Sequence, residues 1–189
     1  MTAQERRERE RAQRERMIVT TARDLAEAEG WNAVTTRRLA ELIEYSQPVL
    51  YSHFTGKDAI MAAVAVEGFA ELAAELHAAR AKATAAQAAL TAVVSTYVDF
   101  AERRPALYDA MFIRAVDLQF AHPETPAELH EAFGALRDAL RPFTGDDLDV
   151  HTEVLWASLH GLVTLMRGGR LPAETHERRI ALLLDRFAG

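Results

Sequence analysis

The chain has 189 residues, 49% of them hydrophobic, and carries 22 Lys and Arg against 28 Asp and Glu, a formal net charge of −6. This length suffices for one small domain and one larger helical domain. The absence of Cys excludes disulfides, thiolate catalysis and Cys-based zinc sites. Because no apolar run approaches the roughly 18 residues of a membrane span and no signal-peptide pattern is present, we expect a cytoplasmic protein with no membrane partner.

The first sixteen residues alternate Arg with Glu, with several opposite charges at i, i+4 spacing. This pattern favours a helical or frayed extension of the first helix. The alternative is a DNA arm, in which Arg6, Arg7, Arg9 and Arg11 enter a minor groove. The first helix should run to about Glu29 and stop at Gly30, with Trp31 in the core. Its predicted buried stripe is Ile18, Ala22, Leu25 and Ala26.

Residues 35–57 predict two short helices around a tight turn. Thr35 or Thr36 can cap the first helix. Its predicted inward face consists of Leu39, Ala40, Leu42 and Ile43. Residues 44–46 interrupt this pattern, and Ser46 is a suitable N-cap for a second helix from Gln47 to about Phe54, with Pro48 tolerated in its first turn. Such a pair of helices is the layout of a DNA-reading helix-turn-helix.

The second short helix exposes polar and aromatic side chains where a merely soluble helix would carry charges. The residues expected at its surface or along its edges are Gln47, Pro48, Val49, Tyr51, Ser52 and His53. Gln can bond bidentately to adenine, and Pro or Val can meet a thymine methyl group. An Arg fork at Arg37 suits a guanine edge or a phosphate. Residues 1–58 hold ten Lys or Arg and ten Asp or Glu, which predicts specific contact more than strong non-specific adhesion.

From residue 58 onward the sequence has no strand alternation and predicts only helices, about nine in the whole chain. The expected helices are 58–82, 85–103, a short one opened by Pro105, one containing Leu129, Phe133, Leu136 and Leu140, then 147–167, and a last one containing Ile180, Leu183, Leu184 and Phe187. The expected fold is therefore all-α. We place an N-terminal three-helix domain at 12–65 and a helical-bundle domain at 66–189, with the boundary inside a continuous helix.

Residues 23–65 resemble the DNA-binding domain of the TetR family of transcriptional repressors, most closely at TTRRLAEL, at QPVLYSHF and at Lys57-Asp58. The resemblance implies a recognition helix ending in L-Y-x-H-F. It also implies roles for individual residues: Gln47, Pro48 and Val49 as base readers, Tyr51, His53 and Lys57 as backbone contacts, with Thr36 and Arg37 in support. One position departs from the family pattern, because Glu44 stands where many members have Gly. We therefore expect a different turn geometry there.

The segment EVLWASLHGLVTLM, residues 153–166, and the segment RRPALYDAMF, residues 103–112, resemble a subgroup of the same family named for its Trp, His and Gly. In that family the last two long helices pair with those of a second subunit, which implies a homodimer. A Gly inside an amphipathic helix costs about 1 kcal/mol relative to Ala and often marks close helix approach. The expected interface is Leu155, Leu159, Gly161, Leu162 and Met166, although packing inside one subunit would give the same stripe.

An effector pocket is expected where large or amphipathic residues fall on the helices that line the cavity in relatives. These residues are Phe69, Tyr97, Phe100, Tyr108, Met111, Phe112, Trp156 and His160, with Arg114 a partner for an anionic group. Ordinary core packing is the competing interpretation for each of them. If a pocket exists, its lining predicts a mostly apolar or aromatic small molecule.

The motifs favour a ligand-responsive bacterial repressor that binds a palindromic operator in double-stranded DNA as a homodimer. The alternative is a helical small-molecule sensor with weak or lost DNA binding, motivated by Glu44 and the negative total charge. An enzyme is not expected. We find no catalytic pair, metal signature or phosphate loop, and so predict no catalytic residues, no metal and no cofactor.

Overall fold

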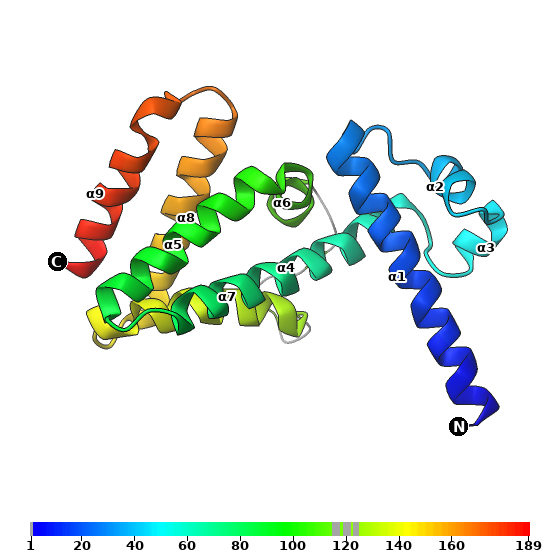
Figure 1. The fold of residues 1–189 in the computed structure, drawn as a ribbon, viewed down its shortest axis with the longest axis horizontal. Coiled ribbons are helices and arrows are strands. Elements are labelled where there is room, and N and C mark those ends of the chain that lie inside the picture. Colours follow the sequence, from blue (N-terminus) through cyan, green and yellow to red (C-terminus); the bar gives the residue numbers. More distant parts are fainter. Residues whose placement is uncertain (1, 115–117, 119–121, 123–124) are drawn as a thin grey trace. The chain divides into compact units, whose positions relative to one another are not determined.

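The computed structural model describes residues 2–114, 118, 122 and 125–189, which contain nine α-helices and no strand (Figure 1). The helices are α1 (Ala3–Glu29), α2 (Thr36–Leu42), α3 (Gln47–Tyr51), α4 (Lys57–Ala81), α5 (Ala86–Arg103), α6 (Pro105–Phe112), α7 (Ala127–Leu140), α8 (Leu148–Arg167) and α9 (His176–Ala188). Short 3-10 turns lie at Arg141–Phe143 and Ala173–Thr175. The predicted all-α fold is confirmed.

The chain divides into two compact units. Unit 1 comprises Met1–Gly68 and Arg104–Thr125, and unit 2 comprises Phe69–Arg103 and Pro126–Gly189. Helix α4 begins in unit 1 and ends in unit 2, whereas α6 belongs to unit 1. The division into domains 12–65 and 66–189 remains a prediction.

Helix α1 is continuous from Ala3, so the Arg/Glu-rich N-terminus is a helical extension, as predicted. A capping box starts the helix: the Thr2 hydroxyl accepts from the Glu5 amide, and the Glu5 carboxylate accepts from the Thr2 amide. Gly30 ends it with a positive φ of 80°, a conformation that glycine adopts without steric cost. The predicted stripe of Ile18, Ala22, Leu25 and Ala26 is buried, together with Val19.

Helix α6 is docked onto α1 by hydrogen bonds within unit 1. The Glu27 carboxylate accepts from the backbone amides of Ala106, at 3.1 Å, and Leu107, at 3.0 Å. These amides open α6 and have no partner within the helix, so Glu27 caps it from a distant part of the sequence. Trp31 lies in the core, as predicted, and is 2% exposed. Its Nε1 donates to the Ala106 carbonyl at 2.8 Å.

Gly68, on α4, allows the other side of α6 to approach closely. A Cβ atom at this position would lie 2.7 Å from Sδ of Met111 and 2.8 Å from Cδ1 of Leu107, distances shorter than van der Waals contact. The missing side chain therefore makes room for α6 inside unit 1.

Replacing Glu27 by Ala should lower the free energy of unfolding by about 1–2 kcal/mol, because two amides of α6 lose a charged acceptor. Chemical denaturation would measure the change. Asp24→Ala, on the same helix and 65% exposed in its side chain, is the matched control and should change stability by less than about 0.5 kcal/mol. Equal losses in the two variants would contradict the capping role.

Unit 2 is a helical bundle in which α5, α7, α8 and α9 pack on one another. Its buried side chains include Leu72, Leu76, Leu90, Val93, Leu129, Leu136, Leu155, Leu159, Val163, Ile180 and Leu184. Ion pairs join the helices at the surface: Arg103 meets Glu75 at 2.6 Å, and Asp138 lies between Arg141, at 3.0 Å, and Arg80, at 3.8 Å. The hydrogen bond from Arg141 lowers the pKa of Asp138 more than burial raises it.

Candidate nucleic-acid interface

Helix α2 begins as the sequence predicted. Thr35 is its N-cap, and the hydroxyl of Thr35 accepts from the Arg38 amide at 3.2 Å. Leu39 and Ala40 are buried, but Leu42 is 54% exposed, so the prediction of an inward Leu42 was wrong. At about 100° per residue, position 42 lies roughly 110° from the middle of the face formed by Leu39 and Ala40, which carries its side chain outside the buried stripe.

The turn after α2 contains Glu44 with a φ of 57°, the only non-glycine residue with positive φ in the described part of the chain. We expected Glu44, in place of the family's Gly, to change the turn geometry. Instead Glu44 adopts the left-handed conformation that glycine favours, and the backbone continues directly into α3. This conformation destabilises the folded protein, because in the left-handed region the Cβ atom crowds the following carbonyl oxygen.

Glu44→Gly should raise the free energy of unfolding by about 0.5–1 kcal/mol, because relief of the left-handed strain exceeds the extra chain entropy of Gly. Glu41→Gly provides the control. Glu41 lies within helix α2, so the same replacement should cost about 1 kcal/mol there. Thermal or denaturant unfolding of both variants measures the difference, and a destabilised Glu44→Gly would overturn our account of the turn.

Helix α3 is shorter than predicted, running from Gln47 to Tyr51, and Ser52 and His53 form a turn. Ser46 occupies the N-cap position with extended backbone but makes no side-chain capping bond, and Pro48 lies in the first turn as expected. Leu50 is fully buried and anchors the helix to the core. The predicted reading residues are exposed: Gln47, Pro48, Val49, Tyr51 and Ser52.

Polar contacts place α2 and α3 relative to each other and to α1. The hydroxyls of Tyr51 and Thr36 are 3.4 Å apart, within hydrogen-bonding distance across the two helices. Arg38 forks onto the Glu29 carboxylate of α1 at 2.8 and 2.6 Å. Arg37, by contrast, is 79% exposed and pairs only along its own helix, with Glu41. A phosphate could therefore compete for Arg37 without disturbing the fold.

His53 lies at the edge of the exposed face, as a half-buried residue whose side chain turns inward. Its side chain is 5% exposed, and Nδ1 lies 3.3 Å from Oε1 of Glu15 on α1. The chain turns after Tyr51, which carries residue 53 toward α1. Lys57 is also engaged within the protein, because its Nζ donates to the Trp31 carbonyl at 2.5 Å.

The N-terminal turns of α1 reach the end of α3. Arg11 donates from Nη2 to the Ser52 carbonyl at 3.3 Å and pairs with Glu15 at 2.9 Å. Glu15 therefore holds both Arg11 and His53. Arg6, Arg7, Arg9 and Arg11, the arginines of the alternative DNA arm, belong to a regular helix, and their entry into a minor groove remains a prediction.

The predicted effector residues fall in two different units. In unit 2, Phe69, Tyr97 and Phe100 are core side chains, and Trp156 and His160 are half-buried. In unit 1, Tyr108 and Met111 are buried, Phe112 is half-buried and Arg114 is exposed. The rings of Tyr108 and Phe112 lie 4.7 Å apart between centroids. Partial burial lowers the pKa of His160, which favours its neutral form.

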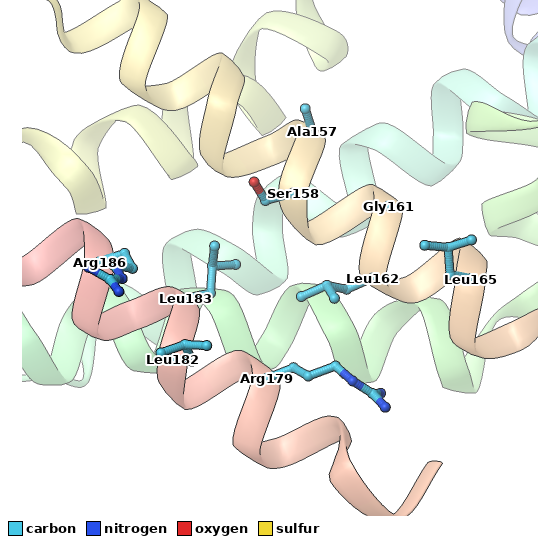
Figure 2. Close-up of a pocket in the computed structure, with 9 residues that line it drawn as sticks. All are labelled: Ala157, Ser158, Gly161, Leu162, Leu165, Arg179, Leu182, Leu183 and Arg186. Atoms are coloured by element: carbon cyan, nitrogen blue, oxygen red, sulfur yellow. The ribbon is translucent and has the colours of Figure 1, made fainter. Parts of the chain in front are cut away.

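The predicted dimer residues separate into buried and accessible groups. Leu155 and Leu159 are fully buried in unit 2, so the expectation that they line a surface was wrong: they face α5 and α7 in the bundle core. Gly161, Leu162 and Met166 are partly accessible. Gly161 and Leu162 line a shallow groove of about 470 Å³ between α8 and α9 (Figure 2). Its other lining residues are Ala157, Ser158, Leu165, Arg179, Leu182, Leu183 and Arg186.

Among residues 2–114, 118, 122 and 125–189, no group of three His, Asp or Glu side chains is arranged to hold a metal ion. None of the helices in the same residues is long and apolar enough to cross a membrane.

The two short helices, their exposed polar face and the separate helical bundle define a helix-turn-helix regulatory protein. Residues 18–64 match the family model for bacterial regulatory proteins of the tetR family, and residues 90–187 match the model for the tetracyclin repressor-like C-terminal domain. The second match alone spans more than half of the chain. The chain therefore belongs to the tetR family of bacterial regulatory proteins.

Individual relatives support this membership. The uncharacterized HTH-type transcriptional regulator YobS of Bacillus subtilis (strain 168) is 32% identical over 103 residues, which are 54% of this chain and 53% of YobS. The chain thus matches about half the length of this curated relative.

Solved structures show the same fold. A protein of unknown function from Rhodococcus sp. RHA1 is similar with a TM-score of 0.71 and 24% identity, over 93% of this chain and 95% of the other. RolR in complex with its ligand resorcinol is similar with a TM-score of 0.70 and 18% identity, over 95% and 90% of the two chains.

Proposed function

We propose that this protein is a sequence-specific transcriptional repressor that binds a palindromic operator as a homodimer and is released by a small-molecule effector. The observation that carries this proposal is α3, whose exposed side chains have hydrogen-bonding and apolar groups but no charge, beside an exposed Arg37. Membership in a family of bacterial regulators supports DNA binding over the alternative of a sensor that has lost it, and gives no support to an enzyme. Its operator DNA would lie in the bacterial cytoplasm.

The chemistry of each side chain predicts which part of the DNA it would contact. Gln47 would bond to a base edge, and Pro48 and Val49 would contact thymine methyl groups. Tyr51, with Thr36 and Ser52 nearby, would contact phosphates through hydroxyl groups, and such contacts carry no sequence information. Arg37 would break its ion pair with Glu41 and bind a phosphate or a guanine.

The remaining two predicted contacts act differently in this proposal. His53 would position the end of α3 through Glu15 instead of meeting a phosphate, because its side chain is buried. Lys57 would reach a phosphate only after leaving the Trp31 carbonyl.

Gln47→Ala should broaden base preference at one pair of symmetric operator positions, whereas Tyr51→Phe should weaken binding to all operator variants by a similar factor. Selection from a random duplex pool supplies the best operator, and titration of single-base variants with each protein measures both effects. Enrichment of an inverted repeat is the expected result. Uniform losses from both substitutions would refute the division between base and phosphate contacts, and no enrichment at any salt concentration would refute the proposed function.

The proposed dimer uses the α8–α9 face. Four large apolar side chains on these helices are 38–58% exposed: Val150, Val154, Leu165 and Leu182. A Cβ at Gly161 would meet no atom within 4 Å in the subunit, so packing inside the subunit does not explain the glycine. A second copy lying against the groove would cover these side chains and approach Gly161 closely. Binding to a palindromic operator requires two recognition helices roughly 34–36 Å apart, one DNA turn.

Gly161→Leu should convert the dimer to a monomer, because the added side chain would fill the groove that the partner occupies. Gly134→Leu is the matched control, since Gly134 also lies within a helix and also has no atom within 4 Å of an added Cβ. Sedimentation velocity at micromolar concentration measures the mass of both variants and of wild type. A dimeric Gly161→Leu, or equal dissociation of both variants, would place the interface elsewhere.

The effector in this proposal is mostly apolar or aromatic and binds among the side chains of unit 2 that include Phe69, Trp156 and His160. RolR, which shares the fold, binds resorcinol, a small aromatic molecule. Arg114 belongs to unit 1 and is not part of this proposed site. Release of DNA requires only that the effector bind more tightly to a conformation whose recognition helices are wrongly spaced.

A further inference from the structure

The outer turns of α1 carry a set of arginines that the helix-turn-helix does not use. Residues Ala3–Arg16 form about four helical turns, roughly 21 Å in length, and they extend past the α2–α3 pair within unit 1 (Figure 1). Arg7, Arg11 and Arg14 are spaced at i, i+4 and i+7, which places them along one side of the helix. All three are exposed.

The carboxylates of this segment are all engaged within the protein. Glu5 accepts from the Thr2 amide, Glu8 from the Gln4 side chain, Glu10 pairs with Arg6, and Glu15 pairs with Arg11 and His53. Arg7 and Arg14, in contrast, have no ion pair or hydrogen bond to any part of the chain that the structure describes. Their charges, like those of Arg9 and Arg16 on the opposite side of the helix, are available to an outside anion, and residues 3–16 hold six Arg against four Glu.

A contact of Arg11 shows which part of unit 1 this side of α1 faces. Its guanidinium reaches the Ser52 carbonyl, one residue beyond the C-terminal end of α3. The arginine row therefore lies next to the exposed Tyr51, on which the proposed phosphate contacts depend. Arg7 and Arg14, on either side of Arg11, are about 10 Å apart along the helix axis, while each DNA strand carries a phosphate every 3.4 Å or so along its own axis. One strand could therefore meet both arginines.

We propose that Arg7, Arg11 and Arg14 form a second DNA-contacting surface, here called the arginine row, which holds the phosphate backbone beside the bases that α3 reads. This inference rests on the proposed function and extends it from the helix-turn-helix to the N-terminal helix. The row is rigid, because a capped helix carries it and Glu15 ties that helix to His53. It adds affinity and lengthens the footprint without reading sequence.

Salt dependence of binding tests the arginine row directly. The logarithm of the binding constant falls with the logarithm of salt concentration by about 0.9 for each phosphate contact. The double variant Arg7→Gln/Arg14→Gln should therefore lower the slope by about 3 to 4 for a dimer, since two contacts per subunit are lost. Gln is chosen because its helix propensity is close to that of Arg.

The matched control is Arg9→Gln/Arg16→Gln, which removes the same charge from the opposite side of the same helix. These two arginines are also seven residues apart and exposed. Operator DNA trimmed to the inverted repeat gives a second readout, because wild type on trimmed DNA should behave like Arg7→Gln/Arg14→Gln on full-length DNA. Arg7→Lys/Arg14→Lys keeps both charges and should restore the wild-type slope.

Equal slopes for the two Gln double variants would overturn the arginine row, because the effect would then be one of net charge. A slope unchanged by Arg7→Gln/Arg14→Gln would overturn it as well, while leaving operator binding intact. If wild-type protein binds no selected duplex, the proposed function fails and this inference fails with it. The length of operator that the protein protects gives a second check on both of these outcomes. Only loss of the row shortens the protection at the outer ends.

Discussion

Three carboxylates on α1 hold three different elements of unit 1. Glu15 receives His53 from the turn after α3, Glu29 receives the guanidinium fork of Arg38 on α2, and Glu27 caps α6 through two backbone amides. The apolar stripe of α1 supplies most of the burial, but burial alone does not fix the rotation or the position of a short helix along its neighbour. The directional bonds do this for α2, α3 and α6, and the exposed face of α3 depends on them.

This use of acidic residues explains how a unit without excess positive charge can present a surface to DNA. Counting residues 1–58 gives ten cations and ten anions, which argues against an electrostatic interface. In the structure several of these carboxylates pair with groups of the protein itself, and those groups lie against α1. Arg7 and Arg14 take part in none of these pairs, and Arg37 pairs along its own helix with Glu41. The local arrangement of charge, not its sum, decides what an approaching phosphate meets.

The predictable parts of the structure were those set by local signals. Gly30 ends α1, Thr35 caps α2 and Pro105 opens α6, each where the sequence indicated, because these residues act on backbone within a turn of themselves. The exposed residues of α3 from Gln47 to Tyr51 were found in the same way.

The errors at Leu155 and Leu159 concern contacts between distant segments. The His53 side chain turns inward to Glu15, 38 positions earlier, and Leu155 and Leu159 are buried because α8 packs on α5 and α7. No spacing rule within one helix indicates which side meets a neighbour. The roles of Glu27 and Gly68 were not predicted for the same reason, since each residue contacts or makes room for α6, which is distant in the sequence.

The turn between α2 and α3 shows what a residue with a side chain does at a position suited to glycine. A glycine at 44 would let the hinge between the two helices sample many backbone angles in the free protein, and binding to DNA would have to select one of them. Glu44 removes most of these alternatives and leaves the hinge in a single left-handed setting. The entropy of orienting α3 is thereby lost during folding and need not be lost again on the operator.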